Sequence, residues 1–190
     1  MTRAFRLLLF ASALILVVSS TRPARAGADV QAPPPGASAT LPADLLKDWE
    51  SLKDTMMKIG DAMPPDKFGF KPTPELRTFA EQLMHVAGAN VNLMKLIDPK
   101  ATAPTLPEKP TAKEDVLKAL GDSFDFGTAV LKAQTVTTLQ ETVQGPRFLG
   151  PSTRARIAYR CMGHTWDEYG VMTVYLRLNG VVPPASRGSM

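Results

Sequence analysis

The chain has 190 residues, enough for one domain, and 44% of them are hydrophobic, so it can bury a core of its own. Its net charge of +4 comes from four arginines within residues 1–26, and the remainder carries 18 basic and 18 acidic residues. A neutral remainder has no basic patch for nucleic acid, and we predict no nucleic-acid partner.

Residues 1–26 have the pattern of a secretory signal peptide. Arg3 and Arg6 precede an uncharged apolar run at 7–18, and Ala24-Arg25-Ala26 has the small-x-small form of a cleavage site. Twelve apolar residues form a helix about 18 Å long, which is too short for the roughly 30 Å hydrocarbon core of a bilayer, so we expect no stable membrane anchor. We therefore expect an exported protein, located in the bacterial periplasm or outside the cell.

Residues 27–40 are small and proline-rich, and they predict a flexible tether in front of one folded domain over residues 41–187. In this domain the sequence predicts four helices and no strand. The first helix runs from Pro42 to Met63, where apolar side chains recur every three or four residues before Pro64-Pro65 stops it. This periodic set comprises Leu45, Trp49, Leu52, Met56, Ile59 and Met63.

The second predicted helix begins at Thr73-Pro74, with threonine as the N-cap and proline as the first helical residue, and ends at Asp98-Pro99. Residues 99–110 contain four prolines and are predicted to be a connector. The core-facing positions of this helix follow the same spacing: Leu76, Phe79, Leu83, Val86, Asn90 and Ile97.

The third predicted helix starts from a capping-box pattern at Thr111–Glu114 and continues to about Thr142. The fourth runs from Ser152 to Asn179, with Gly180 as its C-terminal cap. Four helices joined by short or medium loops predict an all-α four-helix bundle. The predicted core positions of the third helix are Val116, Leu120, Phe124, Gly127, Val130 and Leu131.

His164 and Glu168 are the pair that points most directly to chemistry. They lie one turn apart in the middle of the apolar face of the fourth helix. A carboxylate is costly to bury there unless a charge or hydrogen bonds compensate it. A divalent cation held by both residues would supply that compensation, and a simple ion pair between them is the alternative.

Three other side chains each have two interpretations. His85, the only other histidine, lies off the predicted apolar stripe, where it lines a wet cleft or faces solvent. Cys161, the only cysteine, is either a soft ligand or nucleophile, or a small buried hydrophobe, and we expect the hydrophobe. Tyr175 either orients a ligand or packs in the core, and we expect core packing.

Two segments resemble the DinB-like (DinB/YfiT-like) family. Residues Pro74–Phe79 and the helix bearing His85 are similar to the second helix of that family, and His164–Gly170 with Tyr175–Arg187 is similar to its last helix and tail. The resemblance spans about residues 42–187. It implies a four-helix bundle that holds a divalent metal, commonly zinc or nickel, with one histidine from the second helix and two from the fourth, spaced His-x3-His.

Carried over to this sequence, the implied metal ligands are His85, His164 and Glu168. Glu168 is a departure, because the family usually has a histidine at that position. Two histidines and one carboxylate form a known open metal site, and the added negative charge also makes iron or manganese alternatives to zinc or nickel. We expect metal binding to be retained; in the alternative, the site binds no metal and Glu168 pairs with His164.

The resemblance implies a metal-dependent hydrolase or transferase in which the metal activates a water or a thiol. We assign no catalytic residue beyond the metal ligands. The alternative is a non-catalytic ligand-binding or stress-associated bundle with a degenerate metal site. We expect a small-molecule ligand as partner, and a homodimer is an open alternative.

Overall fold

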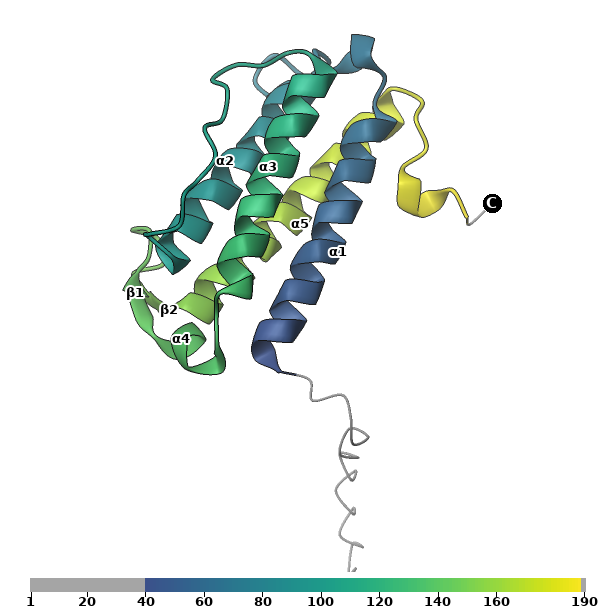
Figure 1. Ribbon diagram of the computed structural model, residues 1–190. Helices are drawn as coiled ribbons and strands as arrows, with labels where there is room; N and C mark the ends of the chain where they lie inside the picture. The colour runs from purple at the N-terminus through teal and green to yellow at the C-terminus, as the bar shows by residue number, and fades with distance from the viewer. Residues whose placement is uncertain (1–39, 189–190) are drawn as a thin grey trace, which may run out of the picture. The chain divides into compact units, whose positions relative to one another are not determined.

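The computed structural model describes residues 40–188, and four long helices dominate this part of the chain (Figure 1). They are α1 (Leu41–Ala62), α2 (Phe79–Ile97), α3 (Lys113–Lys132) and α5 (Arg154–Leu178). Helices α1 and α2 each pack against α3 and α5. The predicted all-α four-helix bundle is therefore confirmed. The predicted signal peptide at 1–26 and the tether at 27–40 lie outside the described residues, apart from Thr40.

The connector between α2 and α3 determines the direction of the helices. Residues 98–112 run along the length of the bundle, so that α3 points in the same direction as α2 (Figure 1). Ala101, Ala103 and Leu106 of this connector are partly buried against the core. The connector therefore covers one side of the helix pair that it joins.

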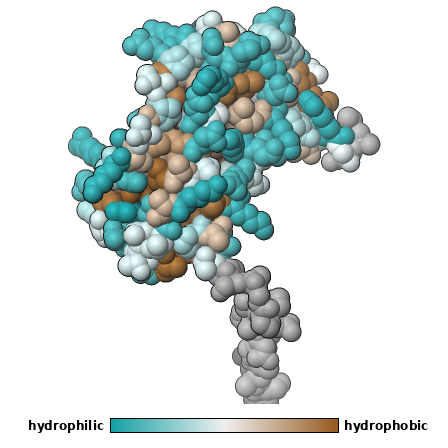
Figure 2. Space-filling view, viewed as in Figure 1, coloured by the Kyte–Doolittle hydropathy of each residue, from teal (hydrophilic) through white to brown (hydrophobic). Residues whose placement is uncertain are grey.

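The helices enclose one hydrophobic core, and all twelve core positions predicted for the first and third helices are buried in it. Trp49 is fully buried, and its indole Nε1 donates a hydrogen bond to the carbonyl oxygen of Phe124 at 2.9 Å. The two rings pack with their centroids 4.8 Å apart. Hydrophilic side chains cover much of the face drawn in Figure 2, with hydrophobic ones between them.

The predicted start of the second helix was wrong. α2 begins at Phe79 and not at Pro74, because Thr78 and Glu81 form a complete capping box. The Thr78 hydroxyl accepts from the Glu81 backbone N–H, and the Glu81 carboxylate accepts from the Thr78 backbone N–H. Residues 71–78 form turns before the helix, and Leu76, predicted to be in the core, is 48% exposed.

The predictions were also wrong at both ends of the third helix. α3 begins after Ala112, which makes no side-chain capping bond, so the predicted capping box at 111–114 does not form. α3 ends at Lys132, and Thr135 then caps the short helix α4 (Val136–Gln140). The threonine- and valine-rich run at 135–138 has low helix propensity, and its hydroxyl groups favour a new cap over continuation of the helix.

A two-stranded hairpin precedes α5, although no strand was predicted. β1 (Thr142–Gln144) pairs antiparallel with β2 (Pro151–Thr153), with Val143 opposite Ser152. Gly150, between the strands, has a positive φ of 62°, which glycine adopts without steric cost. Three-residue strands are too short to show the alternating pattern from which strands are predicted.

The ends of α5 lie close to the prediction. Thr153, one residue after the predicted start, caps α5 by accepting from the Arg156 backbone N–H. Gly180 follows its last turn with φ of 71°, as predicted for a C-terminal cap. Short 3₁₀ helices lie at η1 (Pro65–Lys67) and η2 (Pro184–Ser186). Among residues 40–188, no helix is both long enough and apolar enough to cross a membrane.

Candidate metal centre

Packing of α2 against α5 brings His85, His164 and Glu168 together. The Nε2 atoms of the two histidines are 3.1 Å apart. The Oε1 atom of Glu168 lies 3.5 Å from His85 Nε2 and 3.7 Å from His164 Nε2. One helix thus supplies two ligand atoms one turn apart, and the second helix supplies the third. Among the described residues, these three form the one such group of potential metal ligands.

The spacing of these three atoms fits a small divalent cation. In a tetrahedral zinc site with bonds of about 2.0–2.1 Å, the ligand atoms lie about 3.4 Å from one another. The three separations in this chain, 3.1, 3.5 and 3.7 Å, lie on both sides of that value. A point about 2 Å from all three atoms therefore exists, so the three atoms are spaced closely enough to share one cation.

The site is partly open to solvent. The side chains of His85, His164 and Glu168 are 34%, 24% and 13% exposed. Burial, and then the positive charge of Arg77, lowers the pKa of His85, although the Glu168 carboxylate opposes this shift. A neutral imidazole has the free lone pair that a metal ligand needs, so this environment favours coordination at neutral pH.

Gln82 orients the carboxylate of Glu168, and the sequence had not identified it as part of the site. Its side-chain amide Nε2 donates a hydrogen bond to Glu168 Oε2, and Gln82 is buried. The bond occupies the oxygen that does not face the histidines and leaves Oε1 directed at them. Such supporting hydrogen bonds fix the geometry of metal ligands in proteins. In the sequence, the only sign was that Gln82 precedes His85 by three residues, on the same side of α2.

The sequence pattern of the DinB superfamily matches residues 48–172, which include all four of these residues. The chain belongs to the DinB superfamily. No curated protein sequence matches this DinB superfamily chain.

Two solved structures have the same fold. A DinB-like protein from Bacillus cereus matches with a TM-score of 0.65 and 16% sequence identity, covering 75% of this chain and 95% of its own. A DinB-like protein from Bacillus subtilis matches with a TM-score of 0.60 and 16% identity, covering 72% of this chain and 92% of its own. The family predicted from the sequence is thus confirmed.

Two further candidates lie in the core of this DinB-like bundle. Cys161 is buried, burial raises the pKa of its thiol to about 12, and its Sγ lies 3.5 Å from Asn90 Oδ1. A protonated, buried thiol is neither a ligand nor a nucleophile, as the hydrophobic interpretation predicted. Tyr175 is buried as expected, its hydroxyl donates to the Arg77 carbonyl oxygen at 2.8 Å, and burial followed by Glu168 raises its pKa.

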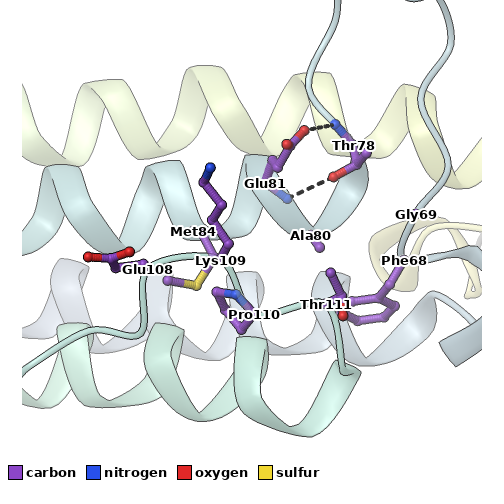
Figure 3. A pocket seen from close by; sticks show the side chains of 10 residues that line it. All are labelled: Phe68, Gly69, Thr78, Ala80, Glu81, Met84, Glu108, Lys109, Pro110 and Thr111. Carbon is purple, nitrogen blue, oxygen red and sulfur yellow. Dashed lines mark hydrogen bonds between the residues drawn. The ribbon is translucent and has the colours of Figure 1, made fainter.

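A cavity of about 250 Å³ lies elsewhere on α2, between its first turns and residues 108–111 (Figure 3). Its lining includes Phe68, Met84 and Pro110, and also the capping pair Thr78 and Glu81, whose two hydrogen bonds appear in Figure 3. The hydrogen bond from the Thr78 backbone N–H is the main cause that lowers the pKa of the Glu81 carboxyl. None of the metal-centre side chains lines this cavity, so it is separate from the metal centre.

Proposed function

We propose that this DinB superfamily chain binds a divalent cation through His85, His164 and Glu168 and acts as a metal-dependent hydrolase or transferase. The observation that carries the proposal is the set of three separations between ligand atoms, which match those of a tetrahedral metal site. Zinc or nickel is the expected cation, and iron or manganese are alternatives because one ligand is a carboxylate. The substrate is a small molecule that can reach the partly open site.

Each residue has a defined task in this proposal. His85 and His164 present ring nitrogen atoms, Glu168 contributes one negative charge, and Gln82 holds the carboxylate in place. A bound divalent cation would supply Lewis acidity that activates a water or a thiol. Three protein ligands leave room for that group, as catalytic zinc sites do.

The second candidate function is a non-catalytic bundle with a degenerate site. The separation of 3.1 Å between the two Nε2 atoms is also a hydrogen-bond distance, so the two imidazole rings can hydrogen bond to each other without a cation. In that case the bundle would bind a ligand without catalysing a reaction on it.

Metal content of the purified protein distinguishes the two functions. Elemental measurement after purification with added zinc or nickel should give about one cation per chain. His164→Ala should retain less than about a tenth of this metal content. Loss of a residue that only supports a ligand already weakens metal binding about 10- to 100-fold, and His164 is itself a proposed ligand. A wild-type protein that never binds a stoichiometric cation would support the degenerate site and contradict the proposal.

Gln82→Ala tests the supporting hydrogen bond separately. It should weaken cation binding by about 10- to 100-fold in a calorimetric titration, because Glu168 is then free to turn away. Gln134→Ala, which removes another buried glutamine amide far along the chain, serves as the control and should leave affinity unchanged. Equal affinities for all three proteins would exclude a positioning role for Gln82.

We also propose that the chain is exported and processed after Ala26. The support is the order of segments within residues 1–26: basic residues come first, an apolar run follows, and small residues form the cleavage site. Expression of the full chain in a bacterium should yield a periplasmic or secreted protein whose N-terminal residue is Gly27. A cytosolic protein that keeps the whole leader would contradict this proposal.

A further inference from the structure

One stretch of the chain concentrates positive charge. Residues 142–166 contain four arginines and no acidic residue. Because residues 27–190 carry equal numbers of basic and acidic residues, the compensating excess of acidic groups lies elsewhere on the chain. The stretch forms the β1–β2 hairpin and the first half of α5, at the end of the bundle where α5 begins (Figure 1). Charge segregated in this way produces a local positive potential that attracts anionic partners.

Three of the four arginines are exposed and have no acidic partner. They are Arg147, Arg156 and Arg160, and none of them forms an ion pair within residues 40–188. The fourth, Arg154, pairs with Glu141 at 2.8 Å. The first turn of α5 contains no acidic residue, although the positive end of the helix dipole favours acidic side chains there. The helix end therefore adds to the positive potential of the arginines.

The loop between the two strands presents an aromatic ring beside this charge. The backbone N–H groups of Leu149 and Gly150 both donate to the Pro146 carbonyl oxygen, at 2.8 and 2.9 Å, so the loop is a single tight turn. A Cβ at Gly145 would lie 2.5 Å from the Gly150 carbonyl oxygen, so the two ends of the loop lie against each other. Phe148, inside this turn, is 71% exposed. A closed turn thus holds an apolar ring in solvent.

Arg156 attaches this turn to α5. Its Nη1 donates to the Leu149 carbonyl oxygen at 3.2 Å and to the Ser152 hydroxyl at 2.8 Å. Both acceptors are neutral, so the guanidinium keeps its full charge beside the turn. Arg160 lies one helical turn further along the same side of α5. We call the following four residues the hairpin tip surface: Arg147, Phe148, Arg156 and Arg160.

We propose that the hairpin tip surface binds reversibly to an anionic lipid membrane. The Phe148 ring enters the boundary between headgroups and acyl chains, and the three arginines contact the lipid phosphates. A bilayer offers both partners together, because an apolar layer lies directly beneath a layer of phosphates. Sites for single-stranded nucleic acid are instead basic grooves in which aromatic rings stack on successive bases, whereas this turn presents one ring. One ring and three arginines form a contact that dissociates, unlike a membrane-spanning helix.

Co-sedimentation of the purified protein with lipid vesicles, in the presence of a chelator, tests this surface. Phosphatidylcholine vesicles containing about one third phosphatidylglycerol should bind the protein at least about tenfold more tightly than pure phosphatidylcholine vesicles. Raising the ionic strength from about 0.1 M to about 1 M should weaken this binding, because the Debye length falls from about 10 Å to about 3 Å. A wild-type protein that does not bind the anionic vesicles, or that binds single-stranded DNA more tightly than these vesicles, would overturn the proposal.

Phe148→Ser tests the insertion of the ring. It should weaken binding to the anionic vesicles by about tenfold or more, because the apolar contact is lost. Leu178→Ser is the matched control: Leu178 is 57% exposed at the other end of α5, and this variant should bind like the wild type. Both side chains are exposed, so circular dichroism should show an unchanged fold. Equal binding of Phe148→Ser and the wild type would exclude this ring from the contact and overturn the proposal.

Arg147→Gln and Arg160→Gln test the charge of the surface. Each should weaken vesicle binding by about fivefold, the contribution expected of one basic residue near an anionic membrane. Lys109→Gln, which removes an exposed cation in the connector just before α3, is the control and should bind like the wild type. An equal loss in all three variants would mean that binding follows the total charge and not the hairpin tip surface, which would contradict the proposal.

Discussion

Glu168→Ala is expected to lose most of the bound metal, whereas Glu168→His is expected to keep it. Glu168 provides the only negative charge among the three ligands, and its Oε1 lies within 3.7 Å of both histidine nitrogens. Alanine leaves two histidines, which are too few for a stable zinc site. Histidine restores three ligands, and the Gln82 amide can rotate so that its oxygen accepts from the new imidazole N–H.

Thermal unfolding with and without a chelator measures how much the bound metal stabilises each variant. With free metal at 100 times the dissociation constant, binding adds about 2.7 kcal/mol to stability, which corresponds to about 5–10 °C in Tm for a chain of this size. The wild type and Glu168→His should lose this stabilisation on chelation, and Glu168→Ala should show none. Asp167→Asn, which removes an adjacent exposed carboxylate, should behave like the wild type. Wild-type metal content in Glu168→Ala would show that the carboxylate is not a ligand.

The helical spacing of apolar residues identified the α5 part of the metal centre, His164 and Glu168, but not the α2 part. On α5, His164 and Glu168 lie on the same helical face as the apolar residues around them. The spacing along this one helix was therefore enough to place both residues on the inward face. On α2, the predicted apolar stripe covered one face of the helix, but α2 packs against both α3 and α5, so its buried surface is wider than that stripe. Gln82 and His85 lie on the α5-facing side, outside the stripe, and His85 was therefore interpreted as lining a wet cleft or facing solvent.

Contacts between distant segments account for what the sequence could not predict. Gln82 and Glu168 are 86 residues apart, and only the packing of α2 on α5 brings them into a hydrogen bond. Asn90 illustrates the same limit in the core. The spacing predicted that it is buried, but its amide is satisfied by Ser123 of α3 and its carbonyl by Thr165 of α5. Periodicity predicts which residues are buried, whereas the partners of buried polar groups depend on the tertiary arrangement.

The packing of α1 against α3 leads to the largest expected effect on stability. Gly127 of α3 lies directly against the indole ring of Trp49, and a Cβ at this position would lie 2.6 Å from Cε2 and 2.9 Å from Nε1. The ring cannot move aside easily, because it is fully buried and its Nε1 is hydrogen bonded to Phe124. Gly127→Ala should therefore destabilise the bundle by about 2–3 kcal/mol, even though alanine is the better helix former.

Gly121→Ala on the same helix is the matched control for this prediction. A Cβ at Gly121 would meet only the flexible end of Met57, at 3.9 Å, which is an ordinary contact. Gly121→Ala should therefore stabilise the protein by about 0.5–1 kcal/mol, through helix propensity alone. Urea unfolding followed by circular dichroism should separate the two variants by about 3 kcal/mol at an unchanged m-value. Equal stabilities would mean that α1 and α3 can move apart at Gly127, and that the close contact with Trp49 does not restrict this position.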